Sequence, residues 1–459
     1  MEKEEKELTG MDALARDYER APVPEMRQKP WYNVGLVWGG VAACLACLMV
    51  GGLVGSWLDL KTAAIAVVCG CLITTVIGAI CSVIGARLNL STPMITRFAF
   101  GDWGVYLVAL VLAFGSYGWF AVQLGLFGET FKASWGIMSG VTPGTVGLWL
   151  AIIIGGILMI STAVFGYRAL AWLSLIAVVP MVGLMIASLV VVLGDYSWGE
   201  LLAHEPPSPM PLAFVISVIA GGFMVGAVVT PDVSRYAKSA GHSVGGVLLG
   251  FFVFQAVIMY IGTILGHAVG EWDIVKIMLG LGWGLIAMVV LILAQWTSND
   301  NNLYSAALAF SVVFRRWGKW ILTAIAGAIG IGLALWGIYD MFTEWLLMLC
   351  ILIPPIAGVF VVDYFFVNRD FYKYENLPKV SKARWLMLAS WAGASFFGFC
   401  MTPKPAPETF GLGLGLIDIS TPFFNITAID TFLIGGALAL ILGLVYKRAK
   451  GGWPEATPA

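Results

Sequence analysis

The sequence predicts an all-α polytopic membrane protein with twelve transmembrane helices. Ten form a five-plus-five inverted-repeat transporter fold, and two extra helices follow at the C-terminus. Hydrophobic residues make up 59% of the chain and charged residues 12%, against roughly 25% charged residues in soluble domains. Apolar stretches of membrane-spanning length follow one another along most of the chain, and glycine pairs interrupt two of them.

A helix that crosses the hydrocarbon core needs about 20 apolar residues. Twelve stretches meet this need, near 34–57, 62–86, 103–128, 144–166, 169–193, 212–231, 244–268, 282–310, 319–337, 340–364, 384–402 and 426–446. They divide the chain into a cytoplasmic N-terminal arm (1–31), a first repeat (32–193), a second repeat (212–366), two accessory helices (383–447) and a cytoplasmic tail (448–459). The arm is densely charged and lacks the apolar region of a signal peptide.

The distribution of Lys and Arg orients these spans. Cytoplasmic loops of membrane proteins carry an excess of both residues. If the N-terminus is inside, only Lys61, Lys132, Lys276 and Lys404 of the 26 basic residues fall outside. A missing span would disrupt this alternation. We therefore expect a multi-pass protein of the inner (plasma) membrane with both termini in the cytoplasm.

Glycine pairs occur in the first and the sixth spans. These spans hold equivalent positions if spans 1–5 and 6–10 form a repeat, and a repeat of five spans must enter the membrane in opposite senses. Glycine often only permits close helix packing. Paired interrupted helices in inverted repeats, however, indicate a binding site at the membrane midplane. The pairs are Gly39–Gly40 and Gly51–Gly52 in the first span, and Gly221–Gly222, with Gly226, in the sixth.

The eighth span contains six consecutive polar residues, Thr297 to Asn302, between two apolar runs. The next basic residues, Arg315 and Arg316, come only after the second apolar run, so we place the polar stretch inside one long helix. The alternative is a helix that ends at Trp296 and continues as a loop.

A helical wheel divides this stretch into two faces. Gln295, Ser298 and Asn299, with Asn302, form a face whose amides can recognise the donor and acceptor edge of a heterocycle. Thr297 and Asn301 form a neighbouring edge that Ser298 shares, and hydroxyl oxygens suit a hard cation such as Na⁺. Interhelical hydrogen bonding is the structural alternative.

Asp300 is the only acidic residue well inside a span, and we assign it no role. Proton coupling usually requires a titratable group within the membrane, so the hydroxyl-rich edge favours Na⁺ over H⁺.

Outside the eighth span, few polar or aromatic residues are candidates for the binding site. The third span carries Ser116, Trp119 and Gln123, and the sixth carries Phe223. Asp232 and Arg235, at the cytoplasmic end of span six, are either a gate or a solvated membrane edge. Cys44 and Cys47 have the spacing of a metal or redox motif, but they lie in an apolar run, which favours small helix-packing residues.

Several stretches resemble the nucleobase–cation symporter family, and most closely its bacterial cytosine permease type. The eighth-span sequence WTSNDNNLY (296–304) and IPPIAGVFVVDYFFVNRDFY (353–372) are the most specific. RFAFG (97–101), GWF (118–120) and AWLSLIAVVPM (171–181) also match. The matches extend nearly from end to end and imply the inverted-repeat fold and alternating access.

The resemblance also implies roles for individual residues. Trp119 corresponds to the third-helix tryptophan that stacks on one face of the base, and Phe223 to the sixth-helix aromatic that closes the other. Thr297 and Ser298 correspond to the hydroxyl pair that coordinates Na⁺ in sodium-coupled members. Backbone carbonyls near Cys44 and Cys47, with that of Ala294, complete this cation site, and Asn299 lies beside the substrate.

Three positions depart from the cytosine permease pattern. Ser116 and Gly222 stand where that pattern has glutamine and serine, and Gln295 stands where it has an asparagine near the eighth-span tryptophan. Gln123 offers an amide one turn beyond Trp119. These departures favour a different base or a related ring, so the sequence does not identify the substrate.

The expected function is import of a nucleobase-like heterocycle, cytosine or a related purine or pyrimidine, by symport with a cation, for which Na⁺ is the favoured candidate. The alternatives are H⁺-coupled transport of a hydantoin, allantoin or thiamine-precursor pyrimidine, and, more distantly, a passive channel. An enzyme is not expected, because His204, His242 and His267 lie in loops or at span ends. We expect no cofactor, no nucleic-acid partner, and a monomer in the lipid bilayer.

Overall fold

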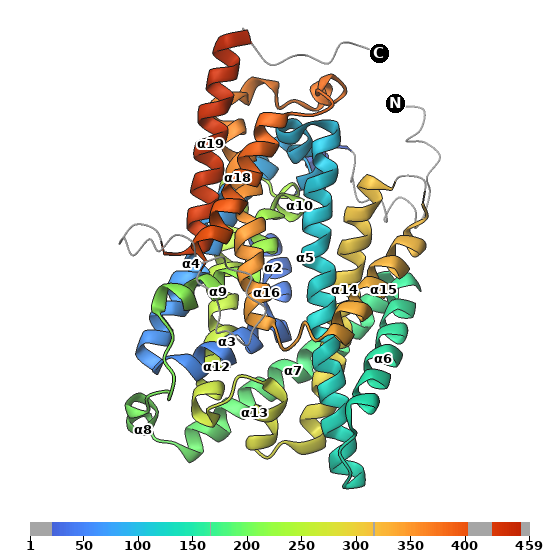
Figure 1. Cartoon of the computed structure of the whole chain (residues 1–459), viewed down its shortest axis with the longest axis vertical. Helices are drawn as coiled ribbons and strands as arrows, with labels where there is room; N and C mark the ends of the chain where they lie inside the picture. Colours follow the sequence, from blue (N-terminus) through green and yellow to red (C-terminus); the bar gives the residue numbers. More distant parts are fainter. Residues whose placement is uncertain (1–20, 166, 315–316, 403–424, 451–459) are drawn as a thin grey trace.

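The computed structural model describes residues 21–165, 167–314, 317–402 and 425–450. Helices account for the regular structure of these residues, apart from one isolated β-bridge between Lys29 and Ala237. Several helices run along the long axis, and α5 (Thr92–Ser139) extends through most of the length (Figure 1). An apolar helical bundle of this kind satisfies its backbone hydrogen bonds internally, as a bilayer requires.

Seven helical segments among the described residues are long and apolar enough to cross a membrane, and a bent helix pair makes eight. Three shorter apolar helices are Val179–Asp195, Trp320–Trp336 and Trp385–Met401. The protein is therefore an all-α multi-pass membrane protein. Twelve spans and the inverted repeat remain predictions.

The expected stretches correspond to helices. The first half contains α2 (Trp31–Ala42), α3 (Leu45–Trp57), α4 (Leu60–Leu88), α5, α6 (Thr145–Phe165), α7 (Tyr167–Asp195) and the short α8 (Trp198–Ala203). The second contains α9 (Leu212–Val228), α10 (Pro231–Ser234), α11 (Ala240–Val247), α12 (Gln255–Val269), α13 (Ile274–Gly280), α14 (Gly284–Val313) and α15 (Lys319–Trp336). The chain continues through α16 (Phe342–Leu352), α17 (Pro354–Val362), α18 (Trp385–Met401) and α19 (Thr427–Lys450).

The first span is broken, as expected, but the break lies between its two glycine pairs and not at either of them. Ala43 and Cys44 leave the helical conformation, and α2 and α3 meet at 61°. The second pair serves packing instead: a Cβ on Gly51 would lie 2.0 Å from the Met259 carbonyl oxygen of α12. Because α2 ends at this break, its last carbonyl groups lack partners within the helix.

The predicted interruption of the sixth span at Gly221–Gly222 is wrong, because α9 is helical through both residues. A Cβ on Gly221 would lie 2.1 Å from the Leu346 carbonyl oxygen, so this glycine allows α9 to approach α16. The helix ends later, at Val229, and α10 follows.

The eighth span is one helix, α14, which continues through the whole polar stretch. The alternative of a helix that ends at Trp296 is therefore wrong. Polar residues 297–302 lie on a helix that packs against α5, α6, α7 and α15.

Helix α5 is kinked at Gly101, whose φ of 86° suits glycine. The segment before α18 fits against this kink, where the Asp102 and Trp103 amides donate to the Ser381 and Lys382 carbonyls, and Arg384 donates its amide to Phe100. A Cβ on Gly101 would lie 2.8 Å from Ser381 O.

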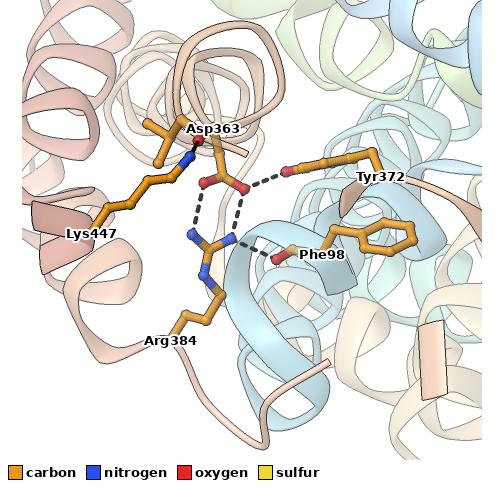
Figure 2. Close-up of polar contacts among 6 residues, drawn as sticks. Phe98, Asp363, Tyr372, Arg384 and Lys447 are labelled. Atoms are coloured by element: carbon orange, nitrogen blue, oxygen red, sulfur yellow. Dashed lines mark hydrogen bonds and ion pairs between the residues drawn. The ribbon is translucent and has the colours of Figure 1, made fainter. Parts of the chain in front are cut away.

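A buried ion pair fixes this junction (Figure 2). The Arg384 guanidinium donates to both carboxylate oxygens of Asp363, at 2.6 and 2.7 Å, and to the Phe98 carbonyl at 2.7 Å. The Tyr372 hydroxyl donates to the same carboxylate at 2.6 Å. Burial, with the Asp363 charge, raises the pKa of Tyr372 well above its usual value, so the donor keeps its proton.

Candidate functional site

A cavity of about 1370 Å³ lies between the broken first span and helices α5, α9 and α14. In Figure 1, α2, α3 and α9 occupy the centre of the molecule, with α5 and α14 beside them. The cavity takes residues from the helix break and from the middle of the three longer helices. It is larger than most small-ligand pockets, which measure about 300–1,000 Å³.

The structure brings most of the predicted site residues to this cavity. Its lining contains Ser116, Trp119 and Gln123 from α5, Gly222 and Phe223 from α9, Ala294, Thr297 and Ser298 from α14, Cys44 at the break, and Asp232 and Arg235 at the mouth. Residues as far apart in sequence as Cys44 and Ser298 therefore share one surface.

Two aromatic rings mark one part of the cavity. Trp119 is 8% exposed and packs edge-on against Phe342, with ring centroids 6.0 Å apart. Phe223 packs edge-on against Phe251 at 4.7 Å. Each ring is supported from behind, so its remaining face can stack on a flat ligand.

The buried amide of Gln123 provides a polar group one turn beyond Trp119. Its Oε1 has no hydrogen-bond partner, and a buried acceptor without a partner costs about 1–3 kcal/mol. A ligand N–H is the kind of donor that this oxygen lacks. Ser116, on the other side of Trp119, donates to the Leu112 carbonyl at 3.3 Å.

The hydroxyls of Thr297 and Ser298 lie on the same cavity as the break at Cys44. Thr297 donates to the Ala294 carbonyl at 3.0 Å. Hydroxyl and carbonyl oxygens are the ligands that hard cations prefer. The arrangement therefore offers oxygen ligands from α14 and from the end of α2.

The prediction that Gln295 and Asn299 contact the substrate needs correction, because the structure does not bring these residues to the cavity lining. The Gln295 amide donates to the Thr130 hydroxyl of α5 at 3.0 Å, and the Asn299 amide contacts the Met159 sulfur of α6 at 3.3 Å. Both side chains are fully buried. Cys47 also lies behind the lining, 3.9 Å from the Cys44 sulfur.

Asp300 faces α6. Its carboxylate accepts a hydrogen bond from the Thr162 hydroxyl at 2.8 Å, and the Trp296 indole donates to the same hydroxyl at 2.9 Å. Asp300, to which we assigned no role from the sequence, therefore joins α14 to α6.

The mouth of the cavity is charged. Asp232 accepts a hydrogen bond from the Thr92 amide at 2.7 Å, at the start of α5, and Arg235 donates to the Asp232 carbonyl at 3.0 Å. Arg97 and Glu375 also line this end.

Aromatic rings pack beside Trp119. Phe342, which contacts Trp119, stacks on Trp272, with 18° between the rings. The rings form an apolar layer there.

Sequence reasoning missed Ser305 and several other lining residues. Asn302, which the wheel placed on the face of Ser298, and Ser305 extend the polar stripe of α14 along the cavity. Their spacing from Ser298, four and seven residues, places them on its helix face, so the wheel held this signal. Trp38, Arg97 and Glu375 had no comparable signal, because tertiary contacts bring them here.

Residues 22–391 match the sequence profile of a family described as permeases for cytosine/purines, uracil, thiamine and allantoin. Cytosine permease of Escherichia coli O157:H7 is 31% identical over 373 residues, which cover 81% of this chain and 86% of that protein. Hydantoin permease of Microbacterium maritypicum is 24% identical, and the match covers 81% of both chains.

The solved structure of Mhp1 in an inward-facing conformation has a similar fold. Its TM-score is 0.77 at 20% identity, and the match covers 94% of each chain. The architecture described above is therefore that of a known transporter fold.

Proposed function

Because this chain belongs to the family of permeases for cytosine/purines, uracil, thiamine and allantoin, we propose that it imports a nucleobase-like heterocycle by symport with Na⁺. It is a membrane permease and not an enzyme. The observation that carries the proposal is the single cavity that joins the Trp119 and Phe223 rings to the Thr297 and Ser298 hydroxyls at a helix break.

The aromatic pair supports a flat substrate. Stacking between a base and an aromatic side chain contributes about 1–3 kcal/mol in single-strand binders. Trp119 and Phe223 come from different helices, α5 and α9, so a ring held by both would also hold these helices together. This dependence links binding to the conformation of the transporter.

The polar groups near Trp119 favour a ring with an N–H donor. Gln123 has an unpaired buried oxygen, and Gly222 adds no side chain to the cavity lining. Pyrimidines, purines and hydantoins all present N–H beside C=O. We therefore propose this class of small heterocycle, with a hydantoin-like ring as the rival to a base.

The helix break supports coupling to a cation. Thr297, Ser298 and the Ala294 carbonyl contribute oxygens from α14, and the carbonyls near Cys44 would contribute the rest. Unwound backbone of this kind commonly coordinates Na⁺ in transporters with inverted repeats. H⁺ coupling is the alternative.

The topology proposed for this cycle has twelve spans, two inverted repeats of five, both termini in the cytoplasm of an inner-membrane protein, and a monomer as the unit. Lys and Arg placement and the broken first span support it. The charged mouth, with Arg97 and Arg235, would then face the cytoplasm.

A thermal-shift screen tests the proposal most directly. The purified full chain is heated with purines, pyrimidines and hydantoins, each with Na⁺ and with choline in its place. A ligand at 100 times its Kd stabilises the folded state by about 2.7 kcal/mol. We expect one ring class to raise the melting temperature, and more so in Na⁺. Equal shifts in Na⁺ and choline would overturn sodium coupling, and no shift with any ring would overturn the substrate class.

Uptake into proteoliposomes distinguishes a symporter from a channel. We expect saturable uptake that collapses when external Na⁺ is replaced by choline. Uptake that rises linearly with substrate concentration and ignores Na⁺ would indicate a passive pore.

A further inference from the structure

Cys44 and Cys47 lie at the helix break, where α3 begins. Cys44 is the N-cap residue of α3, with extended backbone (φ −123°, ψ 159°), and Cys47 lies three residues later in the first turn. Side chains at the N-cap and at the third helical position reach one another, as in a capping box. This spacing brings the two sulfur atoms to 3.9 Å, and both thiols are free.

The pair is reachable from the cavity. Cys44 is half-buried and belongs to the cavity lining, whereas Cys47 is 4% exposed and lies behind it. The other half-buried cysteine, Cys69 of α4, is not part of the lining. A reagent that enters the cavity therefore meets Cys44 first, with a second thiol next to it.

The separation of the sulfurs suits one bridging atom. Metal–sulfur bonds of about 2.3 Å place two sulfurs on a shared atom no more than about 4.6 Å apart. Within the described residues, no group of three His, Cys, Asp or Glu side chains could hold a metal. Two sulfurs without further ligands suit a soft atom of low coordination number, because thiolates select soft metals.

We propose that Cys44 and Cys47 form a dithiol site that binds one thiophilic atom, such as trivalent arsenic or a soft metal ion, and that occupancy of this site stops transport. The second part rests on the proposed function, because the bridge would lie at the backbone that holds the coupling cation. The first part requires only the geometry of the two thiols and their access from the cavity.

Phenylarsine oxide is the probe for the binding part. Its arsenic forms one As–S bond with each thiol, the As=O bond is lost, and both thiol protons leave with the oxygen as water. No electrons are transferred. Mass spectrometry of the detergent-purified full chain should show one such adduct, removed by 2,3-dimercaptopropanol but not by an equal concentration of monothiol.

Single-cysteine variants identify the site. Two linked attachments exceed one by about 10²–10⁴ in affinity, so we expect Cys44→Ser and Cys47→Ser each to need at least ~100-fold more reagent. Cys69→Ser should keep the wild-type response. Cys44→Ala and Cys47→Ala provide second variants if a serine disturbs folding, which gel filtration checks. A stable adduct in all four Cys44 and Cys47 variants would overturn the proposal.

Uptake in proteoliposomes tests the second part. Each variant is compared with its own untreated rate, and we expect the reagent to inhibit wild type and Cys69→Ser but not Cys47→Ser. An adduct that forms without inhibition would overturn the link to transport and leave the dithiol site intact. The mass measurement does not require transport, so failure of the proposed substrate or ion would not affect it.

Discussion

The polar residues of α14 have two roles: some line the cavity, and others form hydrogen bonds to neighbouring helices. Residues next to one another in the sequence can differ in role. Thr297, Ser298 and Asn302 face the cavity. Gln295 and Asp300 instead bond to hydroxyls on α5 and α6. Helices in lipid lack a hydrophobic force that favours one partner over another, so such interhelical hydrogen bonds help to fix how α14 is rotated.

At Trp119, we expect Trp119→Ala to weaken substrate binding by about 1–3 kcal/mol, the contribution of one stacked base, or roughly 5- to 150-fold. Competition for radiolabelled substrate measures the change. Trp149, on α6 and 49% exposed, is the matched control, and Trp149→Ala should bind normally. Unchanged affinity in Trp119→Ala would exclude stacking on this ring.

The hydroxyl pair has a prediction of its own. Thr297→Ala combined with Ser298→Ala should remove sodium dependence, because two oxygen ligands are lost from the proposed cation site. Uptake measured across a series of Na⁺ concentrations reports this. Ser305→Ala, further along the same cavity wall, should retain it. Sodium stimulation that persists in the double variant would place the cation elsewhere.

Gln295 should act on stability and not on selectivity. Gln295→Ala removes its bond to Thr130 at a buried helix contact, and interhelical bonds of this kind average about 0.6 kcal/mol. We expect a lower melting temperature with the same order of preference among bases. Because the two residues are partners, Thr130→Val should add little to Gln295→Ala. A changed order of preference would instead return Gln295 to the substrate site.

At the scale of elements, the break between α2 and α3 is set by its surroundings as much as by glycine. Neither glycine pair is at the break. Gly51 and Gly55 let α3 approach α12, where added Cβ atoms would lie 2.0 and 2.1 Å from the Met259 and Thr263 carbonyl oxygens. This close contact holds α3 in place while α2 takes a different direction.

Gly51→Ala and Gly40→Ala form a matched pair in the same broken span. Gly51→Ala should destabilise the protein, because its Cβ would overlap a backbone atom of α12. A Cβ on Gly40 meets nothing within 4 Å, and alanine is favoured over glycine in helices by about 1 kcal/mol. Thermal unfolding in detergent compares them, and equal melting temperatures would argue against the α3–α12 contact.

At the scale of the whole molecule, the ion pair between Asp363 and Arg384, together with the Phe98 carbonyl, connects the C-terminal helices to α5 (Figure 2). It joins α18 to the end of the α16–α17 span, and through the Phe98 carbonyl to α5. Between its two partners the chain passes the cavity mouth, where Tyr374, Glu375, Leu377 and Pro378 line the wall. The position of that wall therefore depends on the ion pair.

Breaking this pair should affect the whole fold. Asp363→Leu leaves the buried Arg384 charge without a partner, and such changes cost about 3–5 kcal/mol. Adding Arg384→Met should recover much of the loss, since paired apolar replacements are often tolerated. Arg448→Met removes an exposed charge on α19 at the same end and should change stability by less than about 0.5 kcal/mol. Thermal unfolding of the wild type and these three variants decides, and a double variant as unstable as the single would contradict the explanation.

The sequence by itself determined the membrane class, the positions of the helices and the broken first span. It could do so because lipid forces the backbone into long apolar helices, so hydrophobicity along the chain reports them directly. It also placed the polar stretch of α14 inside one long helix. These features depend on composition and order alone.

Only the tertiary structure decided which side of α14 faces the cavity. The wheel grouped Gln295 and Asn299 with Ser298, yet contacts with Thr130 and Met159 turn the two amides toward α5 and α6. Tertiary packing also made α9 continuous through its glycine pair and brought Arg97 and Glu375 to the mouth. The rotation of a helix in a membrane is set by packing against its neighbours, and a single sequence does not state who those neighbours are.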